Sequence, residues 1–145
     1  MGNKLIELYD LAERKDIDVD WFSLAGAESL SVELADGKRC IAIDSQKMDT
    51  IAKEATCLAH ELVHCVSGGF YTEYSPHDLI EKHEYKADKF AVLEMVPQEE
   101  YQQAVKDGHT EIYDLAGHFC VTEDLMKKAV CYYAHSNLNY QLYIF

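Results

Sequence analysis

The sequence predicts an α+β fold, in which an N-terminal helix and a small, three-stranded, mostly antiparallel sheet precede a helical half. Two observations support this prediction. Apolar and polar residues alternate strictly in residues 17–21 and 30–34, as they do in half-buried strands. From about Asp49 onward the apolar residues instead recur with a period of 3.6, which is typical of helices.

The first part of the chain supplies the N-terminal helix and the sheet. Residues 4–15 carry leucines at helical spacing with charges between them, so they are predicted to form an amphipathic helix. Residues 17–21, 30–34 and 40–43 are the predicted strands, the last apolar enough to be buried. The pair Asp36-Gly37 predicts a hairpin turn between the last two strands, which would therefore be antiparallel.

Two longer helices are predicted next. Residues 49–67 form one apolar face, and the glycine pair at residues 68–69 is a typical helix end. The second helix spans residues 76–96, with Ser75 as its expected N-cap and Pro97 as its stop. Shorter helices are predicted at residues 98–106, at residues 111–119 and from the capping sequence at residues 121–124 onward.

Length and charge limit the possible functions. A chain of 145 residues with 48% hydrophobic residues is expected to form one domain, residues 1–145, with a proper core. Its net charge of −13 argues against direct binding of nucleic acid, which requires basic patches. No run approaches the roughly 18 apolar residues of a membrane span, so we expect no membrane association.

The cysteine content indicates a reducing compartment. The chain has 5 cysteines, an odd number, and its first residues are amphipathic rather than an apolar secretory signal. We therefore expect reduced thiols and a cytoplasmic protein.

The strongest candidates for metal binding and catalysis lie in residues 60–64, which are His-Glu-Leu-Val-His. On a helix, His60 and His64 lie on the same face and can bind one metal ion. Glu61 is close enough to act as a general base on a water at that metal. A catalytic zinc has three protein ligands and an open position, so one further ligand is required.

Glu84 is the candidate third ligand. It lies 20 residues after His64, and Asp88 follows one helical turn later on the same face. Asp88 would then accept the outer N–H of a ligand histidine and fix its orientation. The alternative explanation is an ordinary amphipathic helix whose histidines are satisfied polar residues at the edge of the core.

Other residues are weaker candidates. His118 or His135 could donate a hydrogen bond to a tetrahedral oxyanion, and Tyr71 and Tyr74 are alternatives for that role. For each of the four, an ordinary surface or loop position is the favoured interpretation.

Three segments resemble a known family. Residues 58–64 (LAHELVH), 84–91 (EYKADKFA) and 93–97 (LEMVP) resemble the motifs of the ImmA/IrrE metallopeptidases, which are of the gluzincin type. The resemblance covers about residues 5–134. Three departures stand out: Val63 replaces a usual glycine, Val96 is an extra residue before Pro97, and residues 130–132 lack the arginine usual in the later helix.

The resemblance implies a zinc-dependent endopeptidase that holds one Zn²⁺ through His60, His64 and Glu84 and uses Glu61 as the base. The family occurs on phages and mobile elements, and its substrates include helix-turn-helix repressors encoded nearby, whose cleavage derepresses genes. The alternative is a catalytically silent zinc-binding module that binds a partner protein. The intact Glu61 favours the enzyme, because a purely structural site needs no base and is usually closed by a fourth ligand.

Overall fold

A computed structural model describes residues 3–70 and 74–135 of the chain. Its elements, in order, are α1 (Asn3–Arg14), β1 (Asp18–Trp21), β2 (Ser29–Glu33), β3 (Arg39–Ile43), the short 3₁₀ helix η1 (Ser45–Lys47), α2 (Ile51–Ser67), α3 (His77–Met95), α4 (Gln98–Lys106), α5 (Ile112–Phe119) and α6 (Glu123–His135). The α+β prediction is confirmed: a helix and three strands precede a helical half.

The sheet is mixed, with strand order β1-β3-β2. β2 and β3 form the predicted antiparallel hairpin, and Gly37 in its turn has φ +89°, a conformation that favours glycine. β1 pairs with β3 in parallel, so only one of the two pairings is antiparallel. Alternation of residues shows that a strand is half-buried, but it does not show which strand lies beside it.

Helix α2 has a defined cap at each end. Thr50 Oγ1 accepts a hydrogen bond from the backbone N–H of Lys53 at 3.1 Å, which starts the helix two residues later than predicted. Gly68 has φ +72° and ends the helix in the left-handed conformation, as the glycine pair predicts. The fully buried Leu58 and Leu62 lie on the face that packs into the core.

Helix α3 begins differently from the prediction. Ser75 was the expected N-cap with Pro76 inside the helix, but the helix begins at His77 and Pro76 occupies the cap position without a side-chain hydrogen bond. The ψ angle of Pro76 is 141°, which is extended, so the helix can only begin after it. The carbonyl of Pro76 accepts the N–H groups of Leu79 and Ile80, and this replaces a side-chain cap.

The later helices follow the predictions closely. The cap at residues 121–124 is confirmed, since Thr122 Oγ1 accepts the N–H of Leu125 at 3.2 Å at the start of α6. Pro97 separates α3 from α4. No helix within the described residues is both long enough and apolar enough to cross a lipid bilayer.

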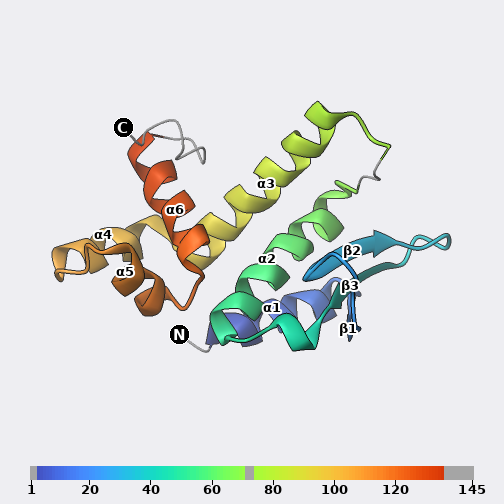
Figure 1. The fold of residues 1–145 in the computed structure, drawn as a ribbon, viewed down its shortest axis with the longest axis horizontal. Coiled ribbons are helices and arrows are strands. Elements are labelled where there is room, and N and C mark those ends of the chain that lie inside the picture. Colours follow the sequence, from blue (N-terminus) through green and yellow to red (C-terminus); the bar gives the residue numbers. More distant parts are fainter. Residues whose placement is uncertain (1–2, 71–73, 136–145) are drawn as a thin grey trace.

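Figure 1 shows how these elements surround α2 and α3, which run antiparallel beside each other. The sheet and α1 cover α2, whereas α4, α5 and α6 gather at the far end of α3. The core includes Ile41 and Ile43 from one face of β3, both fully buried, whereas Cys40 and Ala42 on the other face are partly buried. The edge strand β2 lies against α2, and this contact brings the sheet to the histidine motif.

Candidate metal centre

Helix α2 presents both histidines of the motif to one point. His60 and His64 are one turn apart, and their Nε2 atoms lie 3.3 Å from each other. His64 is buried, with 4% of its surface exposed, and His60 is partly buried. Two imidazole nitrogens of one helix are therefore directed at one small volume.

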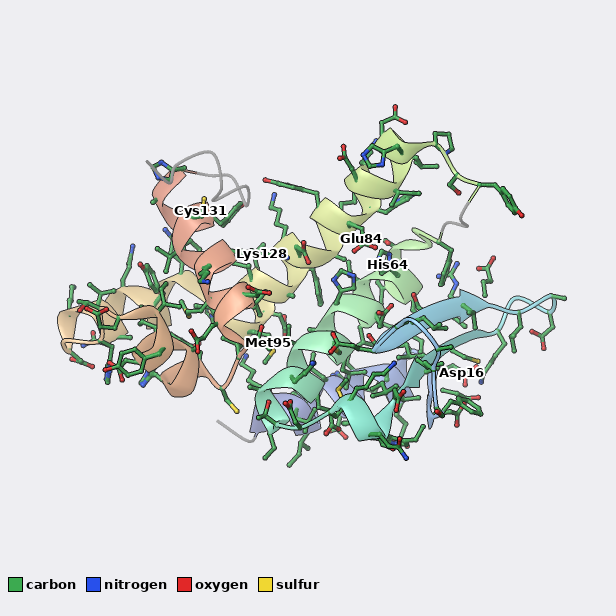
Figure 2. All side chains as sticks on the ribbon, in the orientation of Figure 1. Asp16, His64, Glu84, Met95, Lys128 and Cys131 are labelled. Carbon is green, nitrogen blue, oxygen red and sulfur yellow. The ribbon has the colours of Figure 1, made fainter. Side chains whose placement is uncertain are left out.

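Helix α3 brings a carboxylate to the same volume. Glu84 Oε2 lies 2.8 Å from His60 Nε2, and Glu84 Oε1 lies 3.4 Å from His64 Nε2. Figure 2 shows the labelled Glu84 and His64 directed toward each other across the space between α3 and α2. One ligand atom from each of the three residues lies within 4.8 Å of the others, a spacing that suits a single metal ion.

The Nδ1 nitrogen of each histidine lies within hydrogen-bonding distance of an acceptor oxygen. His64 Nδ1 lies 2.9 Å from the carbonyl oxygen of Gly69, and His60 Nδ1 lies 3.2 Å from Asp88 Oδ1. A carbonyl or carboxylate oxygen can only accept, so each Nδ1 carries the proton. When Nε2 carries no proton, its lone pair is directed toward Glu84, and this is the tautomer that a metal ligand needs. The residues present therefore fit a metal ion.

The site attracts positive charge. Burial disfavours the charged form of His60, but the hydrogen bonds with Asp88 and Glu84 outweigh it and raise the pKa of the imidazole to about 10. Carboxylates so close to the ring favour a cation between them, which can be a proton or a metal ion.

Asp88 is held in turn by helix α6. Lys128 Nζ lies 2.9 Å from Asp88 Oδ2, so the Asp88 carboxylate bridges this lysine and His60. Burial raises the pKa of Asp88, but the hydrogen bonds from His60 and Lys128 exceed that effect and lower it overall. The carboxylate therefore stays ionised at neutral pH. Figure 2 labels Lys128 on α6, the helix that packs against α3.

Glu61 lies beside the three ligand candidates in a cavity of about 170 Å³. Only 7% of its surface is exposed, and its Oε2 accepts a hydrogen bond from Ser29 Oγ at 2.8 Å. The cavity is bounded by the start of the edge strand β2, by the end of α2 and by α3, and its lining residues are Ser29, Leu30, Ser31, His60, Glu61, His64, Gly69, Phe70 and Glu84.

Three of the four weaker candidates lie away from this cavity. His118 lies on α5, where its ring stacks on His109 at 4.7 Å, and His135 ends α6. Tyr74 is 87% exposed. None of these three residues lines the cavity described above, and Tyr71 lies outside the described residues.

The family assignment agrees with this geometry. The model of the IrrE N-terminal-like domain family, Peptidase_M78, matches residues 12–130. The chain belongs to this family. The match confirms the ImmA/IrrE resemblance, and it supports a metallopeptidase-type function for the chain. No curated protein and no solved structure gave a significant match.

Three residues around the candidate metal centre of this IrrE-like domain were not found from the sequence. Ser29 and Lys128 lie 32 and 40 residues from their partners Glu61 and Asp88, and neither belongs to a motif. Gly69 was recognised only as a helix end, not as the acceptor for His64. A Cβ at Gly69 would lie 2.7 Å from His83 Nδ1, so glycine permits the close approach of α2 and α3 there.

Replacing Asp88 with asparagine tests its role in the IrrE-like domain. We expect zinc affinity or turnover to fall by about 10–100-fold, because an amide is a weaker acceptor for His60 and lacks the charge. Zinc affinity is measured by competition with a chelator. Asp78→Asn is the matched control, because it makes the same change at an exposed position of α3, so zinc affinity should be preserved. Equal zinc affinity and turnover in Asp88→Asn and wild type would mean that Asp88 does not support metal binding.

Zinc binding is also expected to release a proton. At pH 7 the His60 imidazole is protonated, because its pKa is raised to about 10, and a protonated ring has no lone pair for a metal. Raising the pH removes this proton, so zinc affinity should increase by up to about tenfold per pH unit below that pKa. Calorimetric titration in buffers of different ionisation enthalpy counts the protons. Binding without proton release would contradict this account of His60.

Proposed function

We propose that this chain is a zinc-dependent endopeptidase that cleaves a protein substrate. The observation that carries the proposal is the convergence of His60, His64 and Glu84 in the cavity that also holds Glu61. Membership of a peptidase family supports it independently.

The donor set favours zinc in a catalytic rather than a structural site. Two imidazole nitrogens and one carboxylate oxygen are a common ligand set for zinc, and three protein ligands leave one position open. When bound, zinc would polarise the scissile carbonyl and make an attacking water acidic. His60, His64 and Glu84 would hold the ion.

Glu61 carries out the proton transfers of the proposed reaction. Its carboxylate takes the proton of the attacking water at Oε1, since Oε2 is hydrogen-bonded to Ser29. The same carboxylate then gives the proton to the nitrogen of the leaving amine. Burial of Glu61 keeps bulk water from competing for these transfers.

An extended peptide fits the edge of the sheet beside the cavity. β2 is an edge strand, and Ser29, Leu30 and Ser31 line the cavity. Edge strands bind extended peptides through main-chain hydrogen bonds. We propose that the substrate lies along β2, which would place a peptide bond over Glu61 and the metal ligands.

The proposed substrate is a helix-turn-helix repressor encoded near this gene. The ImmA/IrrE resemblance supports this choice, and the net charge of −13 suits a basic DNA-binding protein as partner. Cleavage would take place in the cytoplasm and would derepress phage or mobile-element genes.

The test is to incubate the zinc-loaded protein with the purified repressor encoded beside it and to identify fragments by mass spectrometry. We expect a cleavage that requires zinc and stops when a chelator is added. The repressor incubated with zinc alone is the control. Tight zinc binding and repressor binding without any cleavage would contradict the proposal and favour the silent interaction module.

A further inference from the structure

The side chain that holds Glu61 comes from the sheet and not from either helix of the metal centre. Ser29 is the first residue of β2, and its Oγ donates to Glu61 Oε2 at 2.8 Å. Ser29 also lines the cavity that contains Glu61 and His60. The hydrogen bond therefore joins the edge strand to the proposed general base.

The backbone around Ser29 is held by the pairing of β2 with β3 and by a hydrogen bond of the preceding residue. Ser29 lies opposite Ile43 in the pairing of β2 with β3, and Ile43 is fully buried. The carbonyl of the preceding residue, Glu28, accepts the N–H of Asp44 at 3.0 Å, and Asp44 is 3% exposed. The Ser29 hydroxyl is thus presented from a rigid element, as a residue that orients a catalytic group should be.

The neighbours of Glu61 on its own helix are poor donors. Cys57 and Cys65 lie one turn before and one turn after Glu61, on the same face of α2. Thiols donate only weak hydrogen bonds, whereas the Ser29 hydroxyl is a strong donor to a carboxylate.

We propose that Ser29 is a positioning residue of this peptidase, whose hydroxyl holds the Glu61 carboxylate in one orientation with Oε1 directed into the cavity. The inference rests on the proposed function, because Glu61 needs a fixed orientation only if it transfers protons. Without the hydroxyl, the three side-chain torsions of Glu61 are less restricted, and a smaller fraction of molecules has the base in place. Binding of zinc and of substrate does not depend on this bond.

The sharpest test is a pair of variants that differ only in the hydroxyl. Threonine and valine have nearly the same shape and both suit a strand. We expect Ser29→Val to lower kcat for repressor cleavage by about 10–100-fold relative to Ser29→Thr, the range for loss of a hydrogen bond to a charged group. Ser29→Thr should stay close to wild type. The KM and the zinc affinity, measured by chelator competition, should remain within about twofold in both.

Thr50→Ala is the control for a general loss of stability. It removes the hydroxyl that caps α2, the helix that carries Glu61, so it should lower the midpoint of thermal unfolding. Because Thr50 does not contact Glu61, kcat should be unchanged. Equal kcat in Ser29→Val and Ser29→Thr would overturn the proposal, as would a loss of kcat in Thr50→Ala as large as that in Ser29→Val.

Crystal structures of the zinc-loaded variants decide the question without any substrate. We expect the Glu61 carboxylate in one conformer in wild type and in Ser29→Thr, and in more than one, or in a different one, in Ser29→Val. An unchanged single conformer in Ser29→Val would overturn the positioning role. If wild type cleaves no repressor, the proposed function fails, while the Glu61 conformers still decide the role of Ser29.

Discussion

Replacing Glu61 with glutamine is expected to lower the rate of repressor cleavage by about 10²–10⁴-fold, the usual contribution of a general acid–base residue. The amide has nearly the same shape as the carboxylate, but it cannot take a proton from water. Zinc affinity should stay close to that of wild type, because His60, His64 and Glu84 are untouched. The measurement is single-turnover cleavage, together with zinc content by mass spectrometry.

The same helix offers a matched control for this substitution. Glu54 also lies on α2, where its Oε2 accepts a hydrogen bond from the Tyr9 hydroxyl at 2.6 Å, away from the cavity. Glu54→Gln should therefore keep its activity. Full activity in Glu61→Gln would mean that Glu61 does not transfer the proton, and loss of zinc from this variant would mean that Glu61 acts through the metal site instead.

Replacing His64 with alanine is expected to abolish tight zinc binding. Structural zinc sites with four ligands contribute about 10–16 kcal/mol of binding free energy, so one ligand is worth about 3 kcal/mol, or on the order of 100-fold in affinity. The loss should be at least this large, because His64 is buried and its orientation is fixed by Gly69. Chelator competition measures the affinity.

The zinc-free protein should nevertheless remain folded. The core joins the sheet to α1, α2 and the later helices through apolar side chains, so the fold does not depend on the metal as that of a zinc finger does. A chelator should lower the thermal midpoint of wild type modestly. His118→Ala is the control, because His118 lies on α5 outside the cavity and its loss should not alter zinc affinity. A random-coil circular dichroism spectrum for the zinc-free protein would contradict this expectation.

The sequence by itself determined the local features of this protein. The period of the apolar residues defines α2 and α3, and the spacing of four residues puts His60 with His64, and Glu84 with Asp88, on one face of each helix. The helix end at Gly68 and the turn at Gly37 were also predictable, because each requires a backbone conformation with positive φ that glycine adopts readily. These features follow from the geometry of a few neighbouring residues.

Only the tertiary structure decided how these elements meet. The parallel pairing of β1 with β3, the approach of Glu84 to both Nε2 atoms and the bond of Lys128 to Asp88 join distant segments. The hydrogen bond of Ser29 to Glu61 likewise depends on β2 packing against α2. No periodicity records such contacts, because they depend on how whole buried faces pack together. The sequence therefore identified the candidate ligands, and the packing of α2 against α3 and the sheet turned them into one site.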